Sequence, residues 1–289
     1  MLLHEHLENG ADKNPNFAFS EFEGNSLSYQ EANLLSNQLA NKLVSEGLEV
    51  GDRFAFLAKN CTEMAIMYYA ASKVGAVPVP LNYRLADQEW AYIINDSEAK
   101  LIIVKGNEYS DRINQISSEL KNVKKYISIS LDNSIEKFQD FYDWLSDSSN
   151  EKPTLKIHEN DDVYQMYTSG TTGHPKGAVL LQRNVAANIR QYLNSLTLPR
   201  PSRTLLVAPM YHAAAMINMC GCIAIGGTIV IQEDFIPQDV VDCLANEKIT
   251  HTVLVPAMIQ ACLVSVPNVA NNEYLSLIHI SEPTRRRHI

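Results

Sequence analysis

The amino-acid sequence predicts an α/β fold with largely parallel sheets flanked by helices. Strand-like and helix-like segments alternate along the chain, and this alternation favours parallel strands joined by helices. Glycines and prolines stand at the expected ends of several of these segments. The 289 residues are 46% hydrophobic and 20% charged, which is typical of a globular protein with a sizeable core and one or two domains.

Helix-boundary signals are clearest in the first half of the chain. Ser28 and Glu31 form a capping-box pattern, in which each side chain accepts a hydrogen bond from the other residue's backbone, and Gly47 follows as a stop. Gly75 should end a second helix in the same way, and Asp87 should cap a third. The expected segments of this half are strands at 53–58, 101–104 and 126–129, an extended run with prolines at 76–80, and helices at 63–74, 87–94 and 111–120.

Similar signals mark the second half. Residues 131–160 are polar and are the best candidate for a surface excursion or a junction between subdomains. Asn184 should cap a helix, and Pro237 and Pro256 suit the first turns of two further helices. The expected strands are 204–208, 228–231 and 252–255, and the expected helices include 184–196 and 237–246.

The run 213–231 contains no acidic or basic residue and is long enough to cross a membrane. Asn218 and the pair Gly226–Gly227 interrupt it, however. A helix that ends at Gly226, followed by the strand at 228–231, explains the same residues, so we expect no transmembrane segment.

A Gly-rich loop is the most informative feature of the sequence. Residues 167–178 read Tyr-Thr-Ser-Gly-Thr-Thr-Gly-His-Pro-Lys-Gly-Ala and join two apolar, strand-like runs. The glycines let the backbone approach a ligand closely, successive N–H groups can surround an anion, and the hydroxyl groups and Lys176 add donors and positive charge. These residues predict a polyphosphate-binding loop. Pro175 and Gly177 stand where a Walker A loop needs glycine and Ser/Thr, which disfavours an ordinary P-loop and leaves a solvated linker as the alternative.

This loop resembles the phosphate-binding loop of the adenylate-forming superfamily, which includes acyl-CoA synthetases, aryl-CoA ligases, luciferases and the adenylation domains of peptide synthetases. It matches that family's Tyr/Phe-Thr-Ser-Gly-Ser/Thr-Thr-Gly-x-Pro-Lys-Gly-Ala/Val pattern at every specified position. Residues 80–85, 94–97 and 101–104 look like the corresponding stretch of fatty-acyl-CoA and related ligases. The segment 208–212, Ala-Pro-Met-Tyr-His, is similar to the family's Pro-Leu/Met-Phe/Tyr-His segment, and 252–257 to its next strand-to-helix junction.

The resemblance extends over roughly residues 4–275. It implies the incomplete large N-terminal domain of an adenylate-forming enzyme over 1–275, without the family's adenine-binding segment, ribose-binding aspartate, hinge and small C-terminal domain with its catalytic lysine. Residues 276–289 look like translated sequencing-adapter read-through, so we expect a non-native tail there and an inactive, truncated chain. The alternative is a natural basic tail.

The resemblance implies a two-step reaction. A substrate carboxylate attacks the α-phosphorus of ATP to give an acyl-adenylate and pyrophosphate, and a thiol, usually that of coenzyme A (CoA), then displaces AMP. Mg²⁺ would bridge phosphate oxygens, but the family's glutamate ligand lies beyond the resemblance, so no metal ligand is assigned. Lys176 is expected to offset charge on the leaving pyrophosphate. The residues expected to surround the β- and γ-phosphates are Thr168, Ser169, Gly170, Thr171, Thr172 and Gly173.

His212 is the second catalytic candidate. In the family this histidine borders the acyl pocket, where a neutral imidazole could orient the substrate carboxylate or control access. The alternative is a core histidine that precedes a helix. Met216 and Met219 could line an acyl tunnel or simply belong to the core. His4 and His6 lie near the N-terminus, where we expect mobility and no function.

Charge and cysteine content restrict the partners and the compartment. The net charge of −9 argues against nucleic acid as the main partner. The five cysteines form no Cys-x-x-Cys pair and lie in mostly apolar surroundings, so they are expected to be reduced core residues. The polar N-terminus shows no secretory signal. We therefore expect a cytoplasmic protein that binds a small carboxylic acid, ATP and CoA, and its oligomeric state is left open.

Three functions compete. The first is a ligase that converts a fatty or aryl acid to its CoA thioester. The second is an adenylation module that loads a carrier protein, and residues 80–85 and the apolar run after His212 favour the first function over it. The third is a non-catalytic fragment with exposed apolar surface where a sheet is cut.

Overall fold

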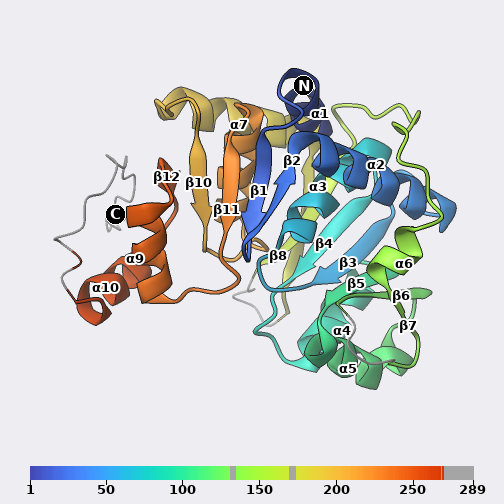
Figure 1. Cartoon of the computed structure of the whole chain (residues 1–289). Helices are drawn as coiled ribbons and strands as arrows, with labels where there is room; N and C mark the ends of the chain where they lie inside the picture. Colours follow the sequence, from blue (N-terminus) through green and yellow to red (C-terminus); the bar gives the residue numbers. More distant parts are fainter. Residues whose placement is uncertain (131–134, 169–173, 268, 270–289) are drawn as a thin grey trace, which may run out of the picture.

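The computed structural model describes residues 1–130, 135–168, 174–267 and 269, and it shows two sheets with helices packed around them (Figure 1). Among these residues, the first sheet has five strands, in the spatial order β12 (His251–Thr252), β10 (Arg203–Leu206), β11 (Thr228–Ile231), β1 (Ala18–Phe22) and β2 (Asn25–Ser28). Its first four strands pair in parallel, and β1 and β2 form an antiparallel hairpin.

The second sheet is entirely parallel. In the part of the chain that the structure describes, its spatial order is β4 (Val77–Leu81), β3 (Arg53–Leu57), β5 (Leu101–Lys105), β6 (Lys125–Ile129) and β7 (Phe138–Asp140). Pro78 and Pro80 lack a backbone N–H, which fits the position of β4 at the edge of this sheet. The expected α/β class with largely parallel sheets is confirmed.

The Gly-rich loop joins a separate antiparallel pair, β8 (Asp162–Thr168) and β9 (Lys176–Leu181). This pair differs from the parallel pattern because strands joined by so short a loop must run in opposite directions. β8 lies alongside β4, so the pair stands beside the edge of the second sheet.

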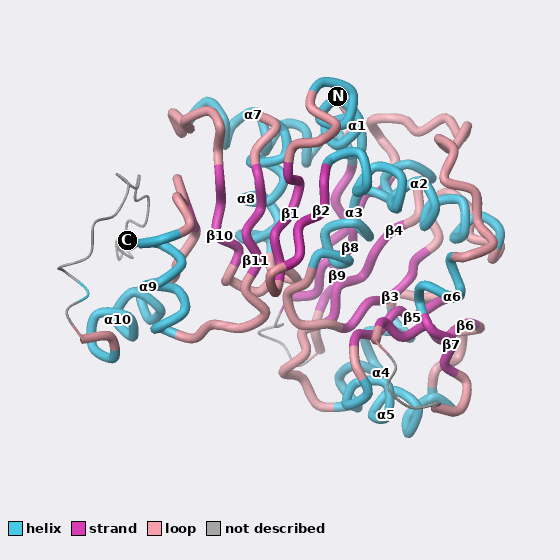
Figure 2. The backbone as a smooth tube through the Cα atoms, in the orientation of Figure 1, coloured by secondary structure: helices cyan, strands magenta, loops and turns pink. Residues whose placement is uncertain are grey.

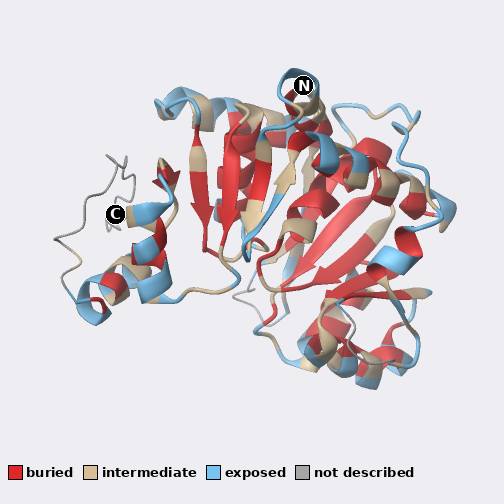
Figure 3. Cartoon of the chain, viewed as in Figure 1, coloured by how far each residue is buried: buried red, intermediate tan, exposed pale blue. Residues whose placement is uncertain are grey.

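One hydrophobic core connects the two sheets. The helices α1 (Leu3–Lys13), α2 (Tyr29–Ser45) and α3 (Thr62–Val74) pack on one another, and α3 also contacts β1 of the first sheet and β4 of the second. Every residue of α3 from Met64 to Val74 is buried. The same cluster contains Phe19 of the first sheet and Phe54 of the second, and we call it the shared core. Figure 3 shows that much of both sheets is buried.

Other helices cover the remaining faces of the sheets (Figure 2). α4 (Asp87–Asp96) and α5 (Asn107–Ile116) pack on the second sheet. Side chains alternate along β3, so Phe54 and Phe56 enter the shared core while Ala55 and Leu57 face α4 and α5 in a second cluster. On the first sheet, α8 (Ala213–Ala224) contributes to the shared core beside α7 (Gln182–Ser195), whereas α9 (Pro237–Asn246) and α10 (Pro256–Ser265) pack on the opposite face.

Three local boundary signals are confirmed. Ser28 caps α2, because its Oγ accepts a hydrogen bond from the Glu31 N–H (3.2 Å) and Glu31 Oε2 accepts one from the Ser28 N–H (2.8 Å). α3 ends at Gly75, whose φ of 71° lies in the left-handed region that glycine tolerates. α9 begins at Pro237 and ends at Asn246, as predicted.

Two cap predictions are wrong. Asp87 and Asn184 are not N-caps, because α4 follows Ala86 and α7 follows Leu181. Asn184 instead reaches back from the third helical position, where its Oδ1 accepts a hydrogen bond from the Leu181 N–H (3.0 Å). Asp87 accepts a hydrogen bond from Arg112 Nε (2.7 Å), and this ion pair joins α4 to α5.

The polar stretch 131–160 is more than a surface excursion. It contains β7 and the short helix α6 (Phe141–Leu145), whose Phe141 and Trp144 are buried in the shared core. A few apolar residues thus anchor a segment whose composition is otherwise polar. The expected helix over 111–120 begins earlier, at Asn107, and the expected strand over 252–255 is shorter, because β12 ends at Thr252.

Mobility was expected at the N-terminus, but this segment instead forms the helix α1. Leu3 and Leu7 of this helix lie in the shared core. His4 is buried, with its Nδ1 3.0 Å from Ser72 Oγ of α3, and burial lowers the pKa of His4. His4 is therefore part of the core and not a free surface histidine.

The apolar run 213–231 folds as α8 followed by β11, with Gly226 between them at a φ of 75°. In the described ranges, no helix is both long enough and apolar enough to cross a membrane. All five cysteines are buried and none is in a disulfide, as expected for core residues.

Candidate functional site

The register of the β8–β9 pair places two predicted site residues at the mouth of the Gly-rich loop. Thr168, the last residue of β8, is paired with Lys176, the first residue of β9. Both side chains are exposed. A hydroxyl group and an ammonium group are therefore available on either side of the loop. The remaining predicted phosphate-binding residues, Ser169, Gly170, Thr171, Thr172 and Gly173, lie outside the described residues.

Hydrogen bonds connect the base of this loop to α4. Tyr167 Oη donates to Asp96 Oδ2 (2.6 Å) and accepts from Gln165 Nε2 (3.0 Å). Arg53 Nε donates to Gln165 Oε1 (3.3 Å), which extends the chain of hydrogen bonds to β3. Burial, together with the hydrogen bond to Asp96, raises the pKa of Tyr167. The phenol therefore keeps its proton and remains a donor.

The other end of the loop also rests on α4. The Tyr92 ring stacks on the His174 ring, with centroids 4.8 Å apart, and Tyr92 Oη donates to the Pro175 carbonyl (3.4 Å). Gly177 follows, and a Cβ at this position would lie 2.3 Å from Gln165 Nε2 and 2.9 Å from Tyr167 Cζ. Only glycine fits there while Tyr167 keeps its place, so the sequence pattern of the loop has a steric reason.

His212 belongs to a turn, residues 209–212, that follows β10 and leads into α8. We call it the histidine turn. Its backbone N–H donates to the Pro209 carbonyl (2.9 Å), and His212 occupies the N-cap position of α8. The side chain is exposed, so His212 is not a core histidine. Met216 and Met219, by contrast, lie in the shared core. His212 thus stands at the surface on a backbone turn, at the end of a parallel strand where α/β proteins place ligands.

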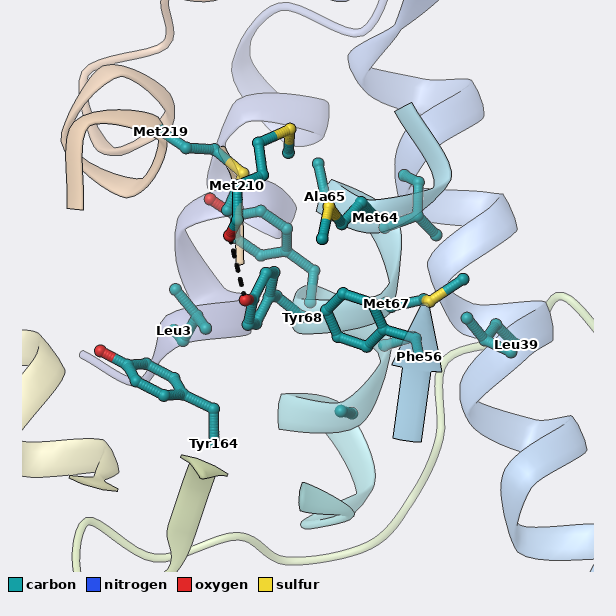
Figure 4. Packing of buried hydrophobic residues seen from close by; sticks show 14 of the residues in the cluster. Leu3, Leu39, Phe56, Met64, Ala65, Met67, Tyr68, Tyr164, Met210 and Met219 are labelled. Atoms are coloured by element: carbon teal, nitrogen blue, oxygen red, sulfur yellow. Dashed lines mark hydrogen bonds between the residues drawn. The ribbon is translucent and has the colours of Figure 1, made fainter. Parts of the chain in front are cut away.

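Tyr68 of α3 lies between the two predicted site segments (Figure 4). Its ring packs edge to face on Tyr164 of β8, with centroids 6.0 Å apart, and its Oη donates to the Met210 carbonyl (3.3 Å) in the turn before His212. Tyr68 and Tyr164 lie in the shared core, whereas Tyr167 and Tyr211 both pack against the second cluster. The fold therefore brings the base of the Gly-rich loop and the histidine turn to one buried helix, although they are distant in the sequence.

A cluster of charged and phenolic side chains lies beside Tyr211. The ring of Tyr83 packs edge to face on Tyr211 (5.7 Å between centroids), and Tyr83 Oη donates to Asp234 Oδ1 (3.2 Å). Lys59 Nζ is 3.4 Å from Asp234 Oδ2, and Arg84 Nη2 is 3.7 Å from Asp234 Oδ1. Partial burial alone would raise the pKa of Asp234, but the Phe235 N–H and Lys59 outweigh burial and hold it below its usual range.

Sequence reasoning assigned no role to Tyr68, Lys59 or Asp234. The available signal for the last two was their position within a few residues of the ends of strands β3 and β11, at the carboxyl edges where parallel sheets collect functional groups. Tyr68 carried no such signal, because it lies inside a buried helix.

The described residues supply no side-chain cluster that could hold a metal ion by itself. They contain no group of three or more His, Cys, Asp or Glu side chains placed to hold an ion, so we assign no Mg²⁺ ligand. A cavity of about 560 Å³ lies between the β1–β2 hairpin and α9, and it shares no lining residue with the β8–β9 pair or the histidine turn. Glu21, Asp239 and Asp242 line this cavity and would repel a phosphate chain.

Comparison with known proteins identifies the family of the chain. The sequence profile of the AMP-binding enzyme family matches residues 7–281. The long-chain-fatty-acid–CoA ligase FadD13 of Mycobacterium tuberculosis is 30% identical over 235 residues, which cover 81% of this chain and 45% of that protein. Feruloyl-CoA synthase of Amycolatopsis sp is 30% identical over 239 residues, which cover 82% of this chain and 45% of that protein. The chain spans about half the length of the curated relatives it matches.

A solved structure shares the fold. The inhibitor-bound N-terminal domain of FACL13 from Mycobacterium tuberculosis matches with a TM-score of 0.85 at 27% identity, covering 94% of this chain and 67% of that chain. The family match covers most of the chain, and the residues at the mouth of the Gly-rich loop lie within it. The chain belongs to the AMP-binding enzyme family, and the relatives named above are acyl-CoA ligases.

Proposed function

We propose that a polypeptide carrying this chain activates a carboxylic acid with ATP and transfers the acyl group to CoA. The chain spans about half the length of its curated relatives, so the proposal concerns this chain together with the portion that those relatives have in addition. The observation that carries it is the Thr168–Lys176 register pair, which closes a loop of the composition needed to bind a polyphosphate.

In the first step, a carboxylate oxygen forms a bond to the α-phosphorus of ATP, and the bond between that phosphorus and the bridging oxygen breaks to release pyrophosphate. Thr168 donates a hydrogen bond to the phosphates, and Lys176 offsets the charge that develops on the leaving group. Residues 169–173 supply further N–H and hydroxyl donors in this proposal. Mg²⁺, when bound, neutralises more of the phosphate charge.

His212 is proposed to orient the attacking carboxylate. Its exposed imidazole lies on the turn next to Tyr211, at the end of a parallel strand, and a neutral imidazole can donate a hydrogen bond to a carboxylate oxygen. In the second step the thiol of CoA attacks the acyl carbon, and AMP leaves with the bonding electron pair.

The proposed substrate is a fatty or aryl acid. One relative is named as a long-chain-fatty-acid–CoA ligase and another as a feruloyl-CoA synthase, so both classes are represented at the same level of identity. A carrier-protein thiol is the alternative acceptor for the second step.

Acid-dependent ATP–pyrophosphate exchange tests the proposal. The complete polypeptide is assayed with a panel of fatty and aryl acids, and CoA or a carrier protein is then added to identify the acceptor. We expect exchange with at least one acid and a thioester after CoA is added. The absence of acid-dependent exchange across the panel would overturn the proposed function. We expect no exchange from the 289-residue chain alone.

A further inference from the structure

Asn60 is a buried polar residue in the turn between β3 and α3, with only 2% of its surface exposed. Its carboxamide makes three hydrogen bonds to backbone groups in the segments that follow β10 and β11. Nδ2 donates to the carbonyl groups of Ala208 and Gln232, both at 3.1 Å. Oδ1 accepts from the Met210 N–H at 2.8 Å. A carboxamide has two N–H donors, and both are used here along with the acceptor oxygen.

These bonds connect the two sheets at their carboxyl edges. Asn60 follows β3 of the second sheet, whereas Ala208 and Met210 follow β10, and Gln232 follows β11, both in the first sheet. The adjacent Lys59 makes ion pairs with Glu233 (3.7 Å) and Asp234 (3.4 Å), which also follow β11. Residues 59–60 therefore contact the segments that follow two strands of the first sheet, β10 and β11.

Met210 is the point at which the histidine turn is fixed. It is buried, its N–H is bonded to Asn60 Oδ1, and its carbonyl accepts from Tyr68 Oη. The next residue, Tyr211, packs on Tyr83, and the His212 N–H closes the turn onto Pro209. The backbone is thus held at several successive points while the His212 side chain remains exposed.

We propose that Asn60 is a positioning residue for the adenylation reaction. It holds the turn 209–212 against the second sheet, beside which the Gly-rich hairpin stands, and so fixes the distance between His212 and the bound ATP. The inference rests on the proposed function. Displacing a group by about 1 Å can slow a reaction by about 100-fold, so a residue that touches no substrate can still control the rate.

Hydrogen exchange of the Met210 amide tests the structural part on the 289-residue chain. Asn60→Ala removes the acceptor, and we expect the peptide containing Met210 to exchange at least about tenfold faster, since its protecting hydrogen bond is lost. Asn37→Ala is the matched control. Asn37 is also buried (4% exposed), its Nδ2 donates to the Asn150 carbonyl (3.0 Å), and its Oδ1 accepts from Lys73 Nζ (2.6 Å), so it bonds to neither of the segments that follow β10 and β11. Unchanged exchange of Met210 in Asn60→Ala would overturn the inference.

A second variant keeps this test decisive if Asn60→Ala does not fold. Tyr68→Phe removes only the hydroxyl that donates to the Met210 carbonyl and keeps the ring against Tyr164. We expect faster exchange in 208–212 and normal exchange in β3. Asn60→Asp, which loses both N–H donors, is measured in the same way, and unchanged exchange in 208–212 in that variant would overturn the inference.

Kinetics of the complete polypeptide test the functional part. In Asn60→Asp, a carboxylate replaces the two N–H donors and faces two carbonyl oxygens, while the acceptor for Met210 is kept. We expect kcat/KM for the acid to fall by about 10- to 100-fold and KM for ATP to change by less than about twofold. Loss of a merely structural residue would change both kcat/KM for the acid and KM for ATP, and that result would overturn the inference.

A double variant separates this inference from the proposed function. If Asn60 acts through His212, adding Asn60→Asp to His212→Ala should cause less than about a twofold further loss. Losses that multiply would show that Asn60 acts independently of His212. Absent acid-dependent exchange in the wild type would instead overturn the proposed function and, with it, the catalytic role of Asn60.

Discussion

Lys176 stands opposite Thr168 at the mouth of the Gly-rich loop, and its side chain is exposed. An exposed ammonium interacts weakly with a distant charge in water, but the interaction strengthens when a substrate closes over it and excludes solvent. The contribution of Lys176 should therefore appear mainly when phosphate charge develops during the reaction and less in the binding of ATP alone.

Removing the proposed phosphate-binding groups should slow adenylation. We expect Lys176→Ala to lower ATP–pyrophosphate exchange in the complete polypeptide by about 100- to 1000-fold, and Thr172→Ala to lower it by a smaller factor. Lys156→Ala removes another exposed lysine and serves as the control. Unchanged exchange in both loop variants would refute the phosphate-binding assignment.

The histidine should affect the other substrate. His212→Ala is expected to raise the acid concentration needed for half-maximal exchange, or to slow adenylate formation, by about tenfold, because the carboxylate loses a hydrogen-bond donor. KM for ATP should stay the same. His158→Ala, which removes another exposed histidine, is the control. Normal acid dependence and normal rates in His212→Ala would make His212 a structural residue.

Among the elements, α4 supports the hairpin that carries the loop. It contributes Asp96 to the hydroxyl of Tyr167 and the ring of Tyr92 to His174, so one helix contacts the chain on both sides of the loop. Trp90 and Ile94 anchor α4 in the second cluster. The packing of the second sheet therefore fixes the helix on which both ends of the loop rest. A displacement of α4 should therefore change KM for ATP more than it changes KM for the acid.

Tyr167→Phe tests this support. The change removes the hydrogen bond to Asp96, and we expect the free energy of unfolding to fall by about 1 kcal/mol and KM for ATP to rise several-fold. Denaturant titration and pyrophosphate exchange measure the two effects. Tyr142→Phe is the matched control, because it removes a phenol–carboxylate hydrogen bond to Glu63 away from the hairpin. An ATP dependence that changes equally in both variants would contradict a specific role for α4.

For the molecule as a whole, the buried histidines connect stability to pH. Burial lowers the pKa of His251 to about 4, and this side chain is only 3% exposed. Burial also lowers the pKa of His4. The unfolded chain therefore binds protons below about pH 6.5 that the folded chain binds only at lower pH. Stability from these groups is present above pH 6.5 and is lost as the pH falls towards 4.

His251→Asn should reduce this loss. We expect the free energy of unfolding of the wild type to fall between pH 6.5 and pH 4, and the variant to lose up to about 3 kcal/mol less over the same interval. Denaturant titrations at several pH values measure the difference. His158→Asn, at an exposed position, should keep the wild-type slope. A variant slope equal to that of the wild type would show that His251 does not contribute.

Sequence signals predicted those features that depend on neighbouring residues. The capping box of Ser28, the stop at Gly75 and the Gly-rich loop act within a few positions, so local rules find them. The order of the strands escaped prediction, because partners such as β1 and β11 lie far apart along the chain. The supporting residues Asn60 and Tyr68 escaped for the same reason, since each acts on a turn formed by residues about 140 to 150 positions later.

The strand order of the first sheet has a consequence for synthesis. β1 pairs in parallel with β11 through Ser20 and Ile229, which are 229 − 20 = 209 positions apart. At a translation rate of about 5–20 residues per second, β1 waits roughly 10–40 s for that partner. The second sheet, by contrast, lies within residues 53–140 and can form during this interval. The hairpin that leaves the ribosome first thus waits longest for its neighbouring strand, and its unpaired edge is the place where a nascent-chain chaperone would be needed most.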